Sequence, residues 1–252
     1  MSIRLTILGK SPSWQDRDGA CSGYQVEVDE RRRLLIDCGN GVFGKLRRHG
    51  DYERIDDVLI SHLHADHMLD LVPFAYALTY GPQLRSERPH LHAPPGGRAA
   101  LRRLCGAWGS ETLIENAFEL TEYDPDAELA LGALRARFRL VPHYVPSYAA
   151  SLDDGRARLV FSADCGPNDA LVELARGAEM LLIEATLASP DLEDRAHLTA
   201  TEAGEIGARA GVGRLVLTHF SDLLDAGTVR AAGERAFGGP VSLALEGESY
   251  EI

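Results

Sequence analysis

The chain of 252 residues is 45% hydrophobic and 25% charged, so it is long enough to bury a core and has the composition of a soluble globular protein. No apolar run approaches the length of a membrane span, and the first residues enter a strand pattern without a signal-peptide architecture, so we expect a cytoplasmic protein that binds no membrane. The formal net charge of −12 argues against a long nucleic acid as partner, because nucleic-acid affinity rests on basic surfaces, but a small anion held by metals stays compatible.

Strands dominate the elements that the first half of the sequence predicts. Those strands cover residues 3–8, 24–28, 33–37 and 58–60. A polar loop over 11–23 follows the first strand, and Asp29-Glu30 is the expected turn between the second and the third. The expected helices cover 42–49 and 69–80, the latter starting near Met68 with Pro73 in its early turns.

The second half changes from strands to an alternation of helices and strands. After a short strand around residues 90–92 and a helix at 98–107, the expected strands cover 117–122, 133–141, 147–152 and 158–162. Three helices, at 168–176, 199–210 and 226–236, then precede strands at 180–184, 214–218 and 241–245. This order predicts an α/β protein with two mixed β-sheets sandwiched between helices, in a single domain over residues 1–252.

Two shorter patterns receive structural interpretations. Arginines at 31–33 and 47–48 are interpreted as a solvated turn and a solvated helix end, although the net charge does not exclude a local basic patch. The cysteines are scattered without metal-binding spacing, so we expect free, buried or half-buried thiols. They are Cys21, Cys38, Cys105 and Cys165.

The segment 61–67 reads Ser-His-Leu-His-Ala-Asp-His and carries four potential metal ligands, His62, His64, Asp66 and His67. It follows an apolar strand, and alternation along an extended segment points His62 and His64 to the same side. Asp66 and His67 face the same space from the start of the next helix. Zinc and similar ions prefer such ligands, and four exceed what one tetrahedral ion with an open position uses. The segment therefore predicts two adjacent metal ions.

Three further candidate ligands stand where predicted strands end. His143 follows the strand at 133–141, Asp164 follows the one at 158–162, and His219 follows the one at 214–218. Strand ends that open on one edge of a sheet are where sites collect in α/β architectures. Together with the first four, these residues are enough for two ions that share one carboxylate, with a bridging hydroxide as nucleophile.

The segment Ser-His-Leu-His-Ala-Asp-His, followed in order by His143, Asp164 and His219, resembles the metallo-β-lactamase superfamily over nearly the whole chain. The resemblance implies a four-layer αββα sandwich with a dinuclear site at its edge. By position, one ion would be held by His62, His64 and His143. The other would be held by Asp66, His67 and His219, and Asp164 would bridge the two. Zinc is the expected metal, and the same ligands suit manganese or iron.

Two other segments resemble the phosphodiesterase branch of this superfamily. Residues 196–204, Ala-His-Leu-Thr-Ala-Thr-Glu-Ala-Gly, resemble the histidine motif of ribonuclease Z. Glu184-Ala185-Thr186 resembles the end of that family's His-Glu-Ala-Thr motif, with Ile183 replacing the histidine. The resemblance implies that His197 assists the leaving group or stabilises the phosphorane, and that Glu184 positions it. We therefore expect Asp66, His197 and Glu184 to take part in catalysis.

Nearby features bear on how this histidine is presented and on the substrate. Thr199 is a plausible helix N-cap, which would present His197 from a loop at a helix start. Twenty residues separate His143 from Asp164, where ribonuclease Z carries a long tRNA-gripping arm. The missing arm and the acidic charge argue against pre-tRNA processing. The chain instead looks like short bacterial hydrolases of this branch, some of which cleave cyclic nucleotides.

These features predict a dinuclear metal-dependent phosphodiesterase acting on a small anionic phosphodiester, such as a cyclic nucleotide or a short RNA end. A metal-activated hydroxide would attack phosphorus in line while His197 assists the departing oxygen. A lactonase or thioesterase-type hydrolase is an alternative that the His197 motif disfavours. A ribonuclease Z-like tRNA 3′-processing nuclease is a second alternative, which the missing tRNA-gripping arm disfavours. A non-catalytic metal-binding sensor would be expected to have lost ligands.

Aromatic residues and a second histidine pair have weaker interpretations. Four aromatic side chains could wall a substrate pocket, although helical spacing is more typical of core positions. They are Trp14, Phe74, Tyr76 and Tyr80. His90 and His92 form a further His-x-His pair, interpreted as structural or rim residues because no acidic ligand stands close in sequence. The sequence leaves the oligomeric state open, and a homodimer is common among relatives.

Overall fold

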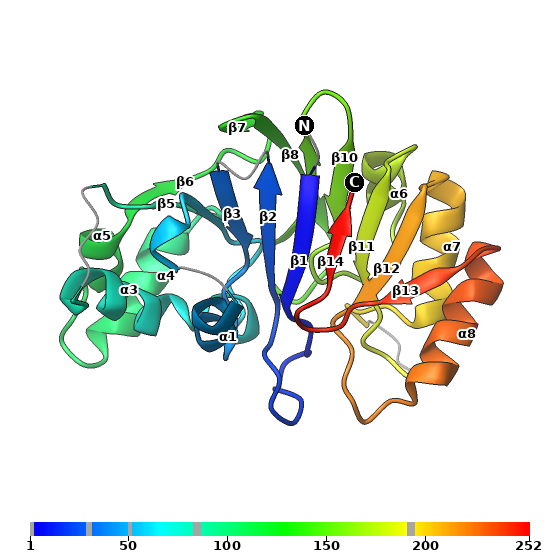
Figure 1. Ribbon diagram of the computed structural model, residues 1–252, viewed down its shortest axis with the longest axis horizontal. Coiled ribbons are helices and arrows are strands. Elements are labelled where there is room, and N and C mark those ends of the chain that lie inside the picture. The colour runs from blue at the N-terminus through cyan, green and yellow to red at the C-terminus, as the bar shows by residue number, and fades with distance from the viewer. Residues whose placement is uncertain (1–2, 29–31, 50–51, 83–86, 191–194) are drawn as a thin grey trace.

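Two seven-stranded sheets face each other in the computed structural model, which describes residues 3–28, 32–49, 52–82, 87–190 and 195–252 (Figure 1). The first sheet consists of β14 (Ser249–Glu251), β1 (Ile3–Gly9), β2 (Gly23–Val28), β3 (Arg32–Ile36), β4 (Asp57–Leu59), β5 (His90–Ala93) and β6 (Glu119–Glu122). The second consists of β13 (Val241–Leu243), β12 (Arg214–Thr218), β11 (Met180–Glu184), β10 (Arg158–Phe161), β9 (Ser147–Asp153), β8 (Leu134–Val141) and β7 (Leu129–Leu131).

Helices cover the outer face of each sheet. The first sheet packs against α1 (Val42–His49), α3 (Leu71–Tyr80), α4 (Gly97–Gly106) and α5 (Leu113–Ala117). The second packs against α6 (Asp169–Ala175), α7 (Ala200–Ala210) and α8 (Ala226–Phe237). This is the αββα sandwich of two mixed sheets that the sequence predicts. No helix among the described residues is long and apolar enough to cross a bilayer.

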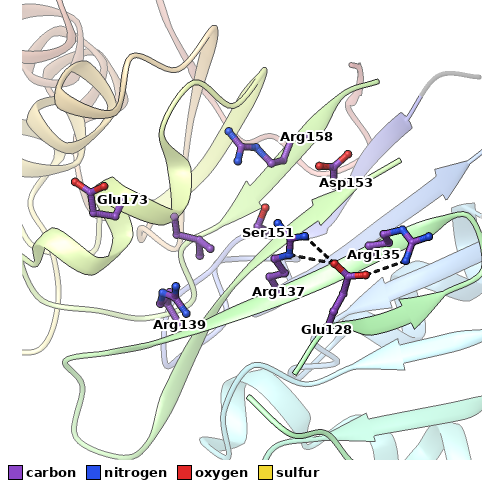
Figure 2. A pocket seen from close by; sticks show the side chains of 9 residues that line it. Glu128, Arg135, Arg137, Arg139, Ser151, Asp153, Arg158 and Glu173 are labelled. Carbon is purple, nitrogen blue, oxygen red and sulfur yellow. Dashed lines mark hydrogen bonds and ion pairs between the residues drawn. The ribbon is translucent and has the colours of Figure 1, made fainter. Parts of the chain in front are cut away.

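The central core lies between the sheets, because inward positions of both sheets are apolar. Tyr24 of β2 and Phe161 of β10 meet there with their ring centroids 5.2 Å apart. On β8, Phe138 and its inward neighbours are buried, whereas three arginines at alternate positions point outward and are exposed (Figure 2). Strand β8 therefore belongs to the core on one face and to the surface on the other.

Several predicted elements differ from the structure in their bounds. The expected helix over 69–80 is preceded by a separate turn, α2 (Ala65–Met68), because Asp70 is held by two contacts that interrupt a continuous helix. Its backbone NH donates to the carbonyl of Cys38, and its carboxylate accepts from the NH of Phe43 in α1. Pro73 is the third residue of α3, where a missing NH leaves no helical hydrogen bond unmade. The short elements β7, β14 and α5 were not expected.

The remaining structural expectations have mixed outcomes. All four cysteines are free and buried, as predicted. Residues 47 and 48 end α1 in solvent, as predicted, but Arg32 and Arg33 lie half-buried on β3 in ion pairs with Asp57 and Glu27, so a solvated turn is wrong for them. Asp29-Glu30 and Arg31 lie outside the described residues. The single domain over 1–252 stays a prediction.

Candidate metal centre

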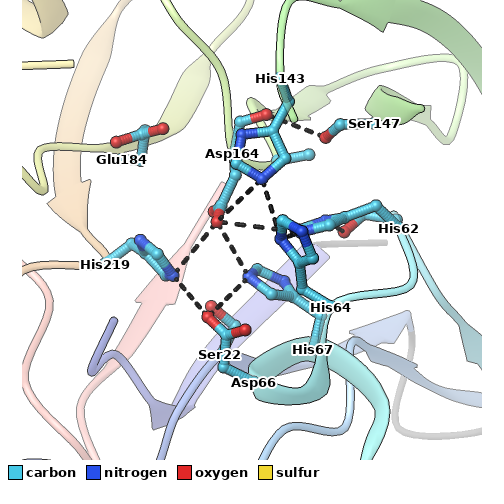
Figure 3. A network of polar contacts seen from close by, with 12 residues as sticks. Ser22, His62, His64, Asp66, His67, His143, Ser147, Asp164, Glu184 and His219 are labelled. Atoms are coloured by element: carbon cyan, nitrogen blue, oxygen red, sulfur yellow. Dashed lines mark hydrogen bonds and ion pairs between the residues drawn. The ribbon is translucent and has the colours of Figure 1, made fainter. Parts of the chain in front are cut away.

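Three histidines and one aspartate meet at the edge where β4, β8 and β10 end (Figure 3). The Nδ1 atom of His64 lies 3.2 Å from Nε2 of His62 and 3.0 Å from Nε2 of His143. The carboxylate of Asp164 lies 3.8 Å from His62 Nε2 and 3.9 Å from His143 Nε2. These four residues, predicted from separate parts of the sequence, form one compact cluster.

A second cluster of four residues shares Asp164 with the first. Oδ2 of Asp164 lies 3.2 Å from His67 Nε2 and 3.4 Å from His219 Nε2. Oδ2 of Asp66 lies 3.5 Å from the same atom of His67 and 3.3 Å from that of His219. Each cluster keeps its donor atoms within 4.8 Å of one another, so Asp164 stands in the bridging position that the resemblance implied.

Two observations indicate that the donor atoms could bind metal cations: their spacing, and one buried nitrogen that has no hydrogen-bond partner. Tetrahedral ligands at 2.0–2.2 Å from an ion lie about 3.4 Å from one another, close to the separations above. Nε2 of His67 is buried and makes no hydrogen bond of acceptable geometry, although it faces the carboxylates of Asp66 and Asp164. A lone pair aimed at two carboxylates is unfavourable unless a proton or a metal ion stands between them.

Two of the rings are oriented by a hydrogen bond at the nitrogen that points away from the clusters. Nδ1 of His143 donates to the carbonyl of Ala196 over 2.9 Å, so its Nε2 lone pair faces the cluster. Nδ1 of His67 donates over 2.7 Å to the buried carboxylate of Asp37, which also accepts from the amide and hydroxyl of Ser61. Sequence reasoning missed Asp37 as a site residue, although it follows β3 as the recognised ligands follow their strands.

The turn that carries Asp66 and His67 is fixed by backbone contacts. The amide of Cys38 donates to the carbonyl of His67 over 2.7 Å. A Cβ at Gly39 would lie 1.8 Å from the carbonyl oxygen of Asp66, so only glycine lets the two segments come this close. The loop after β3 therefore holds α2, and with it both side chains, against the end of the sheet.

Left-handed backbone is concentrated in this part of the structure. Four non-glycine residues among those described have positive φ, and three of them belong to the site or adjoin it: Asp37 (58°), Ala163 (51°) and His219 (53°). Each stands where a strand has just ended and the chain turns sharply. Strained backbone at such positions is typical of functional sites, where it aims side chains that a relaxed turn would direct elsewhere.

Burial and charge set the protonation of the cluster residues. Burial lowers the pKa of His62, His64 and His143 below its usual value, so these rings present the neutral form that binds metals. Burial would raise the pKa of Asp164, but His219 and His67 hold it well below the usual range. Burial would also lower the pKa of His67, which the carboxylates of Asp164 and Asp37 nevertheless raise, so a metal ion would take the place of a proton there.

The expected catalytic pair, His197 and Glu184, adjoins both clusters. Nδ1 of His197 lies 2.9 Å from Oε1 of Glu184, whose carboxylate is buried. The ring of His197 stacks at 5.7 Å on that of His219 and meets that of His143 at 5.0 Å. Thr199 caps α7 in a reciprocal capping box with Glu202, as predicted, which places His197 on a fixed loop two residues before the cap.

Comparison with known proteins shows the family. The model of the β-lactamase superfamily domain matches residues 32–220. The chain belongs to the β-lactamase superfamily. An uncharacterized protein, Rv1339 of Mycobacterium tuberculosis, is 36% identical, with 100% of this chain and 93% of that one covered. The ribonuclease Z of Myxococcus xanthus is 31% identical, with 99% and 98% covered. The crystal structure of the metallo-β-lactamase fold protein YhfI from Bacillus subtilis has a TM-score of 0.90 at 26% identity, covering 100% and 99%.

Within this superfamily fold, the core interpretation of the helical aromatic residues is confirmed for Phe74. Phe74 is fully buried in the core under α1 and α3, so it cannot line a substrate pocket. Tyr76 stacks on Tyr80 and accepts a hydrogen bond from Trp108, and none of these contacts involves a cluster residue. Tyr144 is the exposed aromatic residue that meets the site, with its ring 5.2 Å from that of His143 and 6.1 Å from that of His197. Its position directly after His143 was the available signal.

The second histidine pair lies away from the superfamily's metal edge. Nε2 of His92 lies 3.0 Å from Oδ1 of buried Asp57, and Nδ1 of His90 lies 3.4 Å from Oε2 of Glu119. Acidic residues therefore stand near both histidines in space, because β4 and β6 flank β5 in the sheet. Neither histidine belongs to a metal-type cluster among the described residues.

The family match and the two clusters together show that the chain is a metallo-hydrolase of this superfamily, with one edge of His/Asp clusters suited to divalent metals.

Proposed function

We propose that this chain is a dinuclear metal-dependent phosphodiesterase that acts on a small anionic phosphodiester, such as a cyclic nucleotide or a short RNA end. The observation that carries the proposal is the Glu184–His197 pair beside both clusters. An alkoxide leaving from phosphorus gains from a proton donor, and the Glu184–His197 pair can supply one beside the metals. Sequence similarity to a ribonuclease Z supports the same class of bond.

Two divalent ions would be held by the two clusters, with Asp164 common to both and Asp66 on the second. Zinc suits this mixture of imidazole and carboxylate ligands, and manganese or iron are the alternatives. When bound, such ions supply a hydroxide at neutral pH and neutralise charge on the phosphate oxygens.

His197 is placed to act on the leaving oxygen. Burial would lower the pKa of His197, but the carboxylate of Glu184 raises it, so the ring keeps its second proton to higher pH than an ordinary histidine. With Nδ1 donating to Glu184, the Nε2–H group is free to donate to the departing alkoxide. Glu184 thus orients the ring and favours its acid form.

A substrate panel tests the proposal. Purified protein loaded with zinc, manganese or iron is assayed on bis(p-nitrophenyl) phosphate, cyclic nucleotides, short RNA, a pre-tRNA and a lactone. Cleavage of the phosphodiesters is expected. Turnover of the lactone alone would establish the carboxyl-type alternative, processing of pre-tRNA alone would establish the ribonuclease Z-like one, and metal binding without turnover would indicate a sensor.

The His197→Ala substitution tests the role of the proton donor. Because an alkoxide leaves poorly without protonation, we expect kcat on a cyclic nucleotide to fall about 10²- to 10⁴-fold, the usual contribution of general acid catalysis. Nitrophenolate needs no proton, so the loss on bis(p-nitrophenyl) phosphate should be much smaller. His90→Ala is the matched control, because His90 is an exposed histidine outside the clusters. Equal kcat for His197→Ala and the native chain on both substrates would refute the role.

The cytoplasmic location and the homodimer stay predictions. Size-exclusion chromatography with light scattering measures the assembly directly.

A further inference from the structure

A groove of about 330 Å³ opens on the outer face of the second sheet, beside α6 (Figure 2). None of its lining residues belongs to the metal clusters. Those that matter are Arg135, Arg137 and Arg139 of β8, Ser151 of β9, Arg158 of β10 and Glu173 of α6.

Strand register explains why the surface is hollow here. Ser151 pairs with Arg137 in the β8–β9 ladder, so a short side chain stands between long ones. Ser151 is buried, whereas the three arginines of β8 are exposed at alternate positions on the same face of the strand. The short residue forms the floor and the arginines form one wall, and Leu174 of α6 also lines the groove.

Two of the four arginines in this groove form ion pairs with an acidic side chain, and two form none in the described part of the chain. Glu128 pairs with both Arg135 and Arg137, at 2.9 Å each. Within the described residues, the guanidinium groups of Arg139 and Arg158 have only backbone carbonyl partners, those of Phe138 and Arg176.

The other two acids of the lining make no ion pair with these arginines, although Asp153 stands opposite Arg158 in the β9–β10 ladder. Glu173 pairs with Arg176, and Asp153 accepts from the amide of Gly155. The lining thus carries four arginines against three acids, and among the described residues the guanidinium groups of Arg139 and Arg158 make no ion pair, in a chain whose net charge is −12.

We propose that this groove binds the phosphate group of a phosphate monoester. A guanidinium presents parallel NH donors that match phosphate oxygens, and the Ser151 hydroxyl adds a donor at the floor. A monoester carries close to two negative charges at neutral pH, against one for a diester, so two unpaired arginines favour the monoester. This site stands whether or not the activity proposed above is right, because the two share no residue.

Methyl NMR of the metal-loaded protein tests the proposal. The Leu174 methyls report the groove, and the Leu63 methyls, between His62 and His64 in the chain, report phosphate at the metals. The probes are adenosine 5′-monophosphate, inorganic phosphate, dimethyl phosphate and a short oligonucleotide. We expect the first two to shift Leu174 saturably, and dimethyl phosphate to do so more weakly.

Matched arginine variants separate the groove from general surface charge. Arg139→Gln and Arg158→Gln should each weaken the Leu174 response about tenfold or more, because each removes charge-assisted hydrogen bonds, while Leu63 responds as before. Arg135→Gln, whose guanidinium already pairs with Glu128, should change it by about twofold or less.

Other outcomes overturn the proposal. No Leu174 shift would exclude the site, and equal affinity for dimethyl phosphate would exclude selectivity for a monoester. A shift with adenosine 5′-monophosphate but not with inorganic phosphate would mean that the base, not the phosphate, carries binding. A shift only with an oligonucleotide would make this face a nucleic-acid surface instead.

Discussion

Glu184 organises two functional groups through one buried carboxylate. Oε1 accepts from His197 Nδ1, and Oε2 accepts over 2.7 Å from the Thr186 hydroxyl, which in turn lies 2.9 Å from Nδ1 of His219. The amides of Cys165 and Leu198 also donate to this carboxylate. One side chain therefore orients the proposed proton donor and a proposed metal ligand together.

The Glu184→Gln substitution should move the alkaline limb of the pH–rate profile. The carboxylate raises the pKa of His197, so the acid form persists to higher pH and its contribution is lost as pH rises through that raised value. Without the negative charge, the pKa falls and the loss begins at lower pH. The kcat profile on a cyclic nucleotide measures this, and an unchanged alkaline limb with lower kcat throughout would indicate that Glu184 only shapes the loop.

Tyr144 should contribute to binding when the substrate carries a base. It stands exposed against the rings of His143 and His197, and stacking of a base on an aromatic ring contributes about 1–3 kcal/mol, so Tyr144→Ala should raise KM roughly 5- to 150-fold for thymidine 5′-(p-nitrophenyl phosphate). Methyl p-nitrophenyl phosphate, with the same leaving group and no base, should show little change.

Two further variants make the Tyr144 comparison decisive. Tyr144→Phe keeps the ring and should keep the native KM, whereas Tyr80→Ala removes an exposed tyrosine whose stacking partner is Tyr76 and should have no effect. Equal losses on both esters would show that Tyr144 supports the loop rather than the base.

At the residue scale, the sequence predicted the donors but not what orients them. All seven expected donors lie in the two clusters, because their side chains follow strands whose ends share an edge. Asp37, Thr186 and Tyr144 act through contacts between segments distant in the chain, and no local pattern marks such contacts. Helical spacing indicated the core correctly for Phe74, but the same indication fails for Tyr76 and Tyr80, which are exposed.

Asp57 joins three neighbouring strands of the first sheet. Its carboxylate pairs with Arg32 of β3 at 2.6 Å and with His92 of β5 at 3.0 Å, although it belongs to β4. Burial would raise the pKa of Asp57, but His92 and Arg32 hold it below its usual value. The half of the sheet that carries the Ser-His-Leu-His-Ala-Asp-His segment depends on this network.

The Asp57→Asn substitution should therefore destabilise the protein. Breaking a buried ion pair costs about 3–5 kcal/mol, and partial exposure of Arg32 places the expected loss in free energy of unfolding near the lower end. Because the lowered pKa stabilises the fold only above the usual aspartate pKa of about 4, the difference between variant and native chain should shrink as pH falls below that value. Urea denaturation at pH 7 and pH 3 measures both quantities, and equal differences at the two pH values would contradict the assignment.

At the element scale, helices were more predictable than the short elements. Helix α1 has the predicted bounds, and α7 begins at its predicted Thr199 cap. Short elements failed, because β7, β14 and α5 contain three to five residues and too few repeats to show a period. The division between α2 and α3 depends on Asp70 contacting α1, which is tertiary information.

The candidate donors come from both halves of the sandwich. The first four follow β4 in one sheet, and His143, Asp164 and His219 follow strands of the other. Bound ions would therefore cross-link the two sheets at one edge. The sandwich class was predictable from the order of elements. The pairing of β14 with β1 was not, because these two strands come from opposite ends of the chain.

Metal removal should accordingly lower thermal stability as well as activity. At a free-metal concentration 100 times Kd, binding contributes about 2.7 kcal/mol, which for a chain of this size corresponds to a Tm shift of about 5–10 °C. Calorimetry with and without a chelator measures the shift, and zinc should restore it. Asp164→Ala is the control, because a variant without the shared carboxylate should show a much smaller response to chelation.

The three left-handed residues at this edge have a consequence for mutational tolerance. Each strained position costs about 1–3 kcal/mol, against a typical net stability of 5–15 kcal/mol. The chain therefore stands closer to its unfolding threshold than an unstrained sandwich of the same size would. Destabilising substitutions in the distant core are then less well tolerated because of the strained backbone at this edge. Replacing Ala163 by glycine would remove strain and allow more substitutions elsewhere, but it would hold Asp164 less firmly.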